Sequence, residues 1–171
     1  MKIGVRAHDY GKHSIEGLAS LLREEGYDGA QLALPKVFEE IDSYEDIRLS
    51  HIERIRRAFE KNRVEIPVMG CYMDLGNPDR SVREYAVETL KTCLFYAKEM
   101  GAGVVGTETA YPRLSREERA AWCPYMMDSL MRVMEEAQRI DMKLAIEPVY
   151  WHPLAHLETT LKTIRMVDDP A

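Results

Sequence analysis

Two acidic side chains stand directly after apolar segments of this sequence, where a carboxylate can take part in chemistry. Glu147 follows the apolar segment 144–146, so we expect its carboxylate to be buried. A buried carboxylate needs a cation, a shell of hydrogen bonds or a proton. Glu108, within segment 106–110, repeats this placement earlier in the chain. Two such carboxylates could hold a divalent cation or divide the acid and base roles of a proton transfer, and the alternative for each is a solvent-exposed or purely structural role.

Histidine and cysteine side chains give further candidates. His8 follows the first apolar segment and could contact a polar ligand or have no function. His152 and His156 have the four-residue spacing of helical metal ligands, but Pro153 between them favours a loop. Cys71 could be a nucleophile, although the sequence places no histidine beside it. A small apolar core residue is the favoured interpretation of this cysteine.

Five short apolar segments alternate with five longer segments of helical periodicity, and these elements must position the candidates. We predict strands over residues 2–7, 27–34, 64–72, 103–107 and 143–147. We predict helices over residues 14–25, about 46–62, 81–100, 115–140 and 156–167. Ser14 is a suitable N-cap for the first helix, and Gly26 and Gly101 are placed to end the first and third helices.

Five consecutive βα units require a parallel sheet with helical crossovers, so the fold class is α/β in one domain over residues 1–171. The segment after the first predicted strand, 7–12, lacks the GxGxxG pattern of a doubly wound nucleotide-binding sheet. Part of a (β/α)₈ TIM barrel fits better, because its strands end in polar residues that meet at one mouth. The polar and sulfur-containing residues that follow the predicted strands are His8, Asp9, Tyr10, Lys36, Cys71, Tyr72, Asp74, Thr107, Glu108, Thr109, Glu147, Tyr150, Trp151 and His152.

Composition excludes several classes of protein. The 171 residues are 46% hydrophobic and 30% charged, as in soluble globular chains, with a net charge of -6. This acidity argues against nucleic acid as a partner. No apolar run reaches the roughly 20 residues that a membrane span needs, so we expect a cytoplasmic protein without membrane contact. Three separated cysteines, Cys71, Cys93 and Cys123, predict reduced thiols.

Four segments together resemble the xylose isomerase-like TIM barrels, a superfamily of sugar phosphate isomerases and epimerases that also contains endonuclease IV. They are Ile146-Glu147-Pro148, Gly106-Thr107-Glu108-Thr109, the strand from Ile66 to Tyr72 and the helix from Thr159 to Asp169. The resemblance covers the whole chain. It implies that Glu147 is a ligand of Mn²⁺, Mg²⁺, Co²⁺ or Zn²⁺, with three further ligands on strands six, seven and eight.

The sequence departs from this family where the sixth strand is expected to begin, because it ends at Asp168-Asp169-Pro170-Ala171. A complete barrel has about 250 residues. We therefore expect divalent metal to be bound weakly or not at all, and the chain alone not to be a competent isomerase. The open edges of the first and fifth strands predict self-association.

The resemblance implies a metal-dependent sugar or sugar-phosphate isomerase or epimerase that moves a proton through an enediolate. Glu147 and Glu108 would be the catalytic residues, and His8, Tyr72 and His152 would contact the sugar. Endonuclease IV relatives have histidines after strands two to four, where this chain has Cys71, Tyr72 and Glu108, so DNA repair is disfavoured. A dehydratase that acts on an inosose-like polyol, and a non-catalytic binding or oligomerisation module, are the alternatives.

Overall fold

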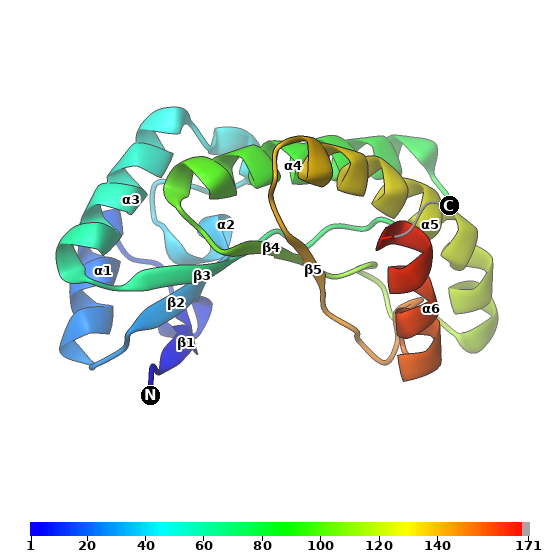
Figure 1. Ribbon diagram of the computed structural model, residues 1–171, viewed down its shortest axis with the longest axis horizontal. Coiled ribbons are helices and arrows are strands. Elements are labelled where there is room, and N and C mark those ends of the chain that lie inside the picture. Colours follow the sequence, from blue (N-terminus) through cyan, green and yellow to red (C-terminus); the bar gives the residue numbers. More distant parts are fainter. Residues whose placement is uncertain (169–171) are drawn as a thin grey trace. The chain divides into compact units, whose positions relative to one another are not determined.

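A computed structural model describes residues 1–168 of the chain (Figure 1). Its strands are β1 (Gly4–Arg6), β2 (Gly29–Leu32), β3 (Glu65–Gly70), β4 (Val104–Thr107) and β5 (Leu144–Ile146). The α-helices are α1 (Ile15–Glu24), α2 (Leu34–Val37), α3 (Leu49–Asn62), α4 (Arg80–Met100), α5 (Arg116–Arg139) and α6 (Leu157–Asp168). Two short 3₁₀ helices, η1 (Ala7–Tyr10) and η2 (Tyr44–Asp46), complete the elements. The predicted segment 159–169 continues beyond α6, and its last residue, like the expected start of a sixth strand, lies outside the described residues.

The strands form one parallel sheet in the order β1-β2-β3-β4-β5, with helices between them. Backbone hydrogen bonds continue this order to β5. The amide of Cys71 donates to the carbonyl of Gly106, at 2.8 Å, and the amide of Glu147 donates to the carbonyl of Thr107, at 2.8 Å. The predicted α/β class, with five consecutive βα units and parallel strands, is therefore confirmed.

Pro67 lies inside β3, although proline has no N–H to donate to a neighbouring strand. The pairing with β2 explains how it is accommodated. Gly29 pairs with Glu65 and Gln31 pairs with Val68, so β3 advances by one more residue than β2 over this stretch. This shift in register interrupts the row of hydrogen bonds between the two strands, and a proline is tolerated where that row is already interrupted.

Contacts divide the described chain into two compact units. Unit 1 contains residues 1–70 and 95–105. In it, α1 and α3 pack against each other, and Figure 1 shows them side by side. The helical periodicity of segments 14–25 and 46–62 predicts one inward apolar stripe on each helix, and the structure confirms both. The fully or almost fully buried residues are Ile15, Leu18, Ala19 and Leu22 on α1 and Ile52, Ile55 and Phe59 on α3. That one domain spans residues 1–171 stays a prediction.

Unit 2 contains residues 71–94 and Gly106 onward, and α5 packs against α6 within it. The inward face of α5 carries Met126, Leu130, Val133 and Ala137, all fully buried. The helical periodicity of segment 115–140 predicts an inward stripe of these four residues and Met134; the four are confirmed, but Met134 is only half-buried. On α4, the periodic apolar positions of the sequence include Tyr85, for which a place in the core is the wrong expectation, because its side chain is 46% exposed. None of the helices in residues 1–168 is long and apolar enough to cross a membrane.

Helix ends agree with the predicted capping residues. The Ser14 hydroxyl accepts a hydrogen bond from the amide of Gly17, at 3.2 Å, at the start of α1. Ser115 and Glu118 form a capping box at the start of α5, in which each side chain accepts from the other residue's amide. Gly26 and Gly101 follow α1 and α4 with φ of 87° and 80°, values that favour glycine.

Candidate functional site

Glu108 and His152 come together at the carboxyl ends of β4 and β5 in unit 2. The Glu108 Oε2 atom lies 4.0 Å from the His152 Nε2 atom. His152 is 1% exposed, whereas the Glu108 side chain keeps 30% of its surface accessible. Burial lowers the pKa of His152, because an imidazolium is costly to remove from water. At neutral pH the site therefore presents a carboxylate beside a neutral imidazole.

Tyr111 connects this pair to the loop that follows β3. Its hydroxyl donates a hydrogen bond to the carbonyl oxygen of Tyr72. Tyr111 is 61% exposed as a residue, but loss of water around its hydroxyl is the largest cause that raises its pKa to about 12, and the negative charges of Asp74 and Glu108 add to the effect. The phenol therefore stays protonated at physiological pH and serves as a hydrogen-bond donor. No sequence argument pointed to Tyr111; its position two residues after the polar run 107–109 was the available signal.

Three buried polar atoms at these strand ends have no hydrogen-bond partner in the described part of the chain. They are Oδ1 of Asp74, Oγ1 of Thr109 and Nδ1 of His152. Asp74 is 4% exposed and Thr109 is fully buried. Burial raises the pKa of the Asp74 carboxyl, although a hydrogen bond from Asn77 opposes the rise. Asp74 and Thr109 follow predicted strands, but the sequence assigned neither of them a role.

Glu147 departs from expectation in one respect. Its side chain is exposed, so the predicted burial of this carboxylate is wrong. The reason is the place of β5 at the end of the strand order, which leaves Leu144 and Ile146 half-buried and Ala145 exposed. The backbone of Glu147 is nonetheless bonded to Thr107, the residue before Glu108. The exposed side chain of Glu147 therefore starts from a backbone position beside the end of β4.

The remaining predicted ligand contacts are divided between the two units. Tyr72 is 8% exposed in unit 2, and its carbonyl accepts the Tyr111 hydrogen bond. His8 lies in η1 of unit 1, where it is half-buried. His156 is exposed whereas His152 is buried, and the amide of His152 closes a turn onto Val149. The two histidines do not share a helical face, as the intervening proline predicted. The roles of His8, Tyr72, Glu108, Glu147 and His152 stay predictions.

A divalent metal does not find a complete set of ligands among these residues. Within residues 1–168, no group of three or more His, Cys, Asp or Glu side chains is placed to hold an ion. A cation of this kind requires several oxygen or nitrogen ligands. The described residues therefore do not by themselves fit the metal that the resemblance implies, and Glu147 is the one ligand it predicts in this chain.

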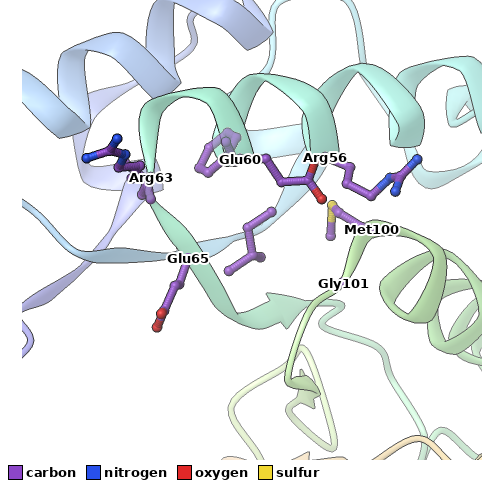
Figure 2. A pocket seen from close by; sticks show the side chains of 9 residues that line it. Arg56, Glu60, Arg63, Glu65, Met100 and Gly101 are labelled. Carbon is purple, nitrogen blue, oxygen red and sulfur yellow. The ribbon is translucent and has the colours of Figure 1, made fainter.

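A cavity of about 310 Å³ in unit 1 lies elsewhere (Figure 2). Arg63, Glu65 and Gly101 help to line it, so it opens at the amino-terminal end of β3. Phe59 and Met100 form part of its apolar wall. The candidate residues follow the carboxyl-terminal ends of strands, and none of them lines this cavity.

Comparison with known proteins identifies the fold. A family model described as xylose isomerase-like TIM barrel matches residues 19–171. No curated protein matches the chain in sequence. The solved structure of 3-keto-D-glucoside 4-epimerase, YcjR, from E. coli is 16% identical, with a TM-score of 0.77 over 98% of this chain and 65% of that one. The structure of D-psicose 3-epimerase in the presence of D-fructose is 14% identical, with a TM-score of 0.78 over 98% of this chain and 60% of that one.

A xylose isomerase-like TIM barrel protein from Mycobacterium smegmatis, in complex with magnesium, is 15% identical, with a TM-score of 0.74 over 99% of this chain and 62% of that one. The chain thus spans between 60% and 65% of the length of these three structures. It belongs to the xylose isomerase-like TIM barrel family. Its five parallel βα units form part of such a barrel.

Proposed function

We propose that this protein is a sugar or sugar-phosphate isomerase or epimerase that acts by proton transfer next to a carbonyl group. The observation that carries the proposal is the pairing of Glu108 with a buried, neutral His152 at the ends of β4 and β5. Strand carboxyl ends are where TIM barrels carry out their chemistry. The similarity in fold to two sugar epimerases supports the reaction class.

In the proposed reaction, a carboxylate removes the proton on the carbon beside the sugar carbonyl. The electron pair moves into an enediolate, and the proton returns to the opposite face or to the neighbouring carbon. Glu147 is the proposed base, because its carboxylate is exposed and accessible to a substrate. Glu108 and His152, with Tyr72, would bind hydroxyl groups and hold the substrate in place.

For the cofactor we propose a divalent metal ion, which would supply Lewis acidity to the substrate oxygens when bound. A magnesium complex of a protein with the same fold supports this part of the proposal. Glu147 would be this chain's ligand. Because the described residues do not complete a ligand set, the chain by itself would bind the ion weakly.

Solvent exchange tests the reaction directly, since it detects proton removal even when turnover is slow. The chain is incubated with D-fructose in D₂O, with and without Mn²⁺, and deuterium at the carbons beside the carbonyl is measured by NMR. We expect slow exchange that Glu147→Gln abolishes. Glu135→Gln changes an exposed carboxylate on α5 and is the matched control. Exchange that does not exceed the enzyme-free rate would contradict the proposal, and loss of water from an inosose would instead support a dehydratase.

A further inference from the structure

A cavity of about 490 Å³ is lined by residues of α5 and α6. Both helices belong to unit 2, where they pack against each other. Cys123 and Met127 line the cavity from α5, and Lys162, Thr163 and Met166 line it from α6. None of the residues placed in the proposed reaction lines this cavity. It therefore forms a second place in unit 2 where a ligand can be bound.

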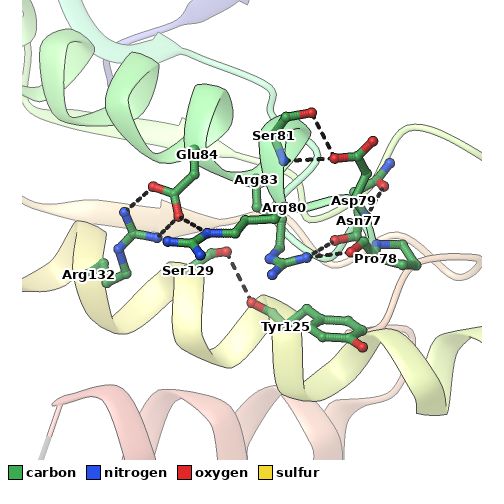
Figure 3. A network of polar contacts seen from close by, with 10 residues as sticks. All are labelled: Asn77, Pro78, Asp79, Arg80, Ser81, Arg83, Glu84, Tyr125, Ser129 and Arg132. Atoms are coloured by element: carbon green, nitrogen blue, oxygen red, sulfur yellow. Dashed lines mark hydrogen bonds and ion pairs between the residues drawn. The ribbon is translucent and has the colours of Figure 1, made fainter.

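Contacts with α4 fix the rotation of α5 about its own axis (Figure 3). Arg132 of α5 pairs with Glu84 of α4, at 2.6 Å between Nη2 and Oε2. The guanidinium of Arg83, also on α4, lies over the ring of Tyr125, with its Cζ atom 4.5 Å from the ring centre. Tyr125 and Arg132 are seven residues apart and so share one face of the helix. The opposite face of α5 is left to α6.

Three sulfur-bearing side chains line the cavity: Cys123, Met127 and Met166. With about 3.6 residues per turn, Cys123 and Met127 stand one above the other on the face of α5 opposite Tyr125. All three side chains are partly accessible, and Met166 is 50% exposed. The unbranched methionine side chain has three rotatable bonds and adapts its position easily. A thiol and two thioethers, supplied by both walls of the cavity, can therefore meet on one bound atom.

The charges around Cys123 restrict the kind of ion that fits. Burial raises the pKa of the Cys123 thiol, and the positive charge of Lys162 from α6 opposes that rise. One thiolate neutralises a monovalent cation, whereas a bound divalent cation would remain positive close to the Lys162 ammonium group. Glu158 also lines the cavity, but with Cys123 it supplies only two of the four ligands that Zn²⁺ usually takes.

Thr163 gives the cavity a hydroxyl group that has no other use in the described part of the chain. Its side chain is 3% exposed, and its hydroxyl makes no hydrogen bond within residues 1–168. Thr160 on the same helix differs, because its hydroxyl donates to the carbonyl of His156, at 3.1 Å. A buried hydroxyl without a partner lowers the stability of a fold. Donation to a metal-bound sulfur would satisfy it and would orient that ligand.

We propose that Cys123, Met127 and Met166 form a binding site for Cu⁺. Thiolate and thioether sulfurs are the soft ligands that select this ion. On binding, the thiol releases its proton to solvent, its sulfur bonds to copper, and each thioether donates one lone pair. Copper enters and stays as Cu⁺, so no oxidant or reductant is needed. This site does not depend on the proposed sugar chemistry, and its ligands differ from the carboxylates that suit Mg²⁺.

Anaerobic titration of the full chain with Cu⁺, in competition with the chromophoric chelator bicinchoninate, measures stoichiometry and affinity. We expect one equivalent of Cu⁺ to bind and Cys123→Ser to abolish that binding. Met127→Leu and Met166→Leu should each weaken it by at least about tenfold. Leucine nearly conserves the volume of methionine, so both variants should keep the fold. Met131→Leu is the matched control, since this 50% exposed methionine of α5 does not line the cavity.

NMR of the chain labelled with ¹³C at its methionine methyl groups identifies the ligands directly. Cu⁺ should shift the methyl signals of Met127 and Met166 and leave that of Met131 in place. Binding that survives Cys123→Ser would show that another thiol holds the ion, and would overturn the proposal. Wild-type affinity in both methionine variants of the cavity would show binding by Cys123 alone, with the same consequence. Absence of a one-to-one complex would also overturn it, and none of these outcomes bears on the proposed function.

Discussion

The imidazole of His152 lies within ion-pair distance of the Glu108 carboxylate, at 4.0 Å between Nε2 and Oε2, yet burial lowers the pKa of that imidazole. The cost of desolvating an imidazolium thus outweighs the attraction of the nearby negative charge. The pair joins residues at the ends of β4 and β5. Protonation of His152 therefore changes the charge of the candidate site and the stability of the fold around it.

This burial predicts how stability depends on pH. The folded state binds a proton on His152 less readily than the unfolded state, whose histidine has a pKa near 6.5. The neutral imidazole therefore makes its full contribution to the stability of the folded state above pH 6.5. That contribution is lost as the pH falls below 6.5. Urea unfolding between pH 8 and pH 5 should show a smaller loss of stability for His152→Gln than for the wild type. His51→Gln is the control, and identical slopes for wild type and His152→Gln would contradict the prediction.

Titration with Mn²⁺ in a calorimeter should detect weak binding at most. Within the described residues no cluster of three potential ligands exists, so Glu147 would act with water and little else. We expect Glu147→Gln to remove whatever heat of binding the wild type shows, with Glu135→Gln unchanged. A sub-micromolar dissociation constant for the wild-type chain would show that its own residues do complete a site.

Gly103 should tolerate no side chain. A Cβ at this position would lie 2.9 Å from the backbone oxygen of Pro67, and a backbone atom of a packed strand cannot move aside cheaply. We expect Gly103→Ala to lower the free energy of unfolding by about 1–3 kcal/mol, the usual cost of overpacking. At Gly76 the nearest atoms would lie at an ordinary 3.4 Å, so Gly76→Ala is the comparison. Urea denaturation of both variants measures the difference, and equal losses would refute the steric argument.

Self-association should occur through the apolar surface around β5 and α6. Ile164 is 45% exposed on α6, and with Met134 and Ile146 it lines an apolar cavity of about 310 Å³. Exposed apolar surface beside an unpaired strand edge favours association. Light scattering should therefore show a mass that rises with concentration, and Ile164→Glu should reduce that rise. Glu135→Gln should leave it unchanged, and a monodisperse monomer in the wild type would contradict this expectation.

The regular elements could be predicted from sequence because their signals are local. The α1 and α3 stripes follow from the 3.6-residue period, and Ser14 and Gly26 mark helix ends by their own chemistry. The short elements η1 and α2 were missed because three or four residues are too few to show a period. Pro67 is compatible with the predicted strand because of a shift in register, which depends on the pairing with β2.

The candidate site was predictable in its location and not in its burial. Polar residues after each strand mark the carboxyl ends, which is how Glu108 and His152 were found. The exposure of their side chains depends on which other segments pack over them. The same holds for Glu147, whose burial was wrongly predicted from the apolar residues before it. Thr109 is buried because the loop after β3 bonds to its carbonyl through Gly76, a contact between residues more than 30 positions apart that no local pattern encodes.

The place of β5 at the end of the strand order gives this strand two kinds of backbone amide. The amide of Glu147 is directed to β4, where it bonds to Thr107. Because amides alternate in direction along a strand, that of Ile146 is directed away from β4. In D₂O the Ile146 proton should therefore exchange with solvent much faster than the Glu147 proton. The two neighbouring amides would report, within one strand, the moment at which another chain or segment pairs with that edge.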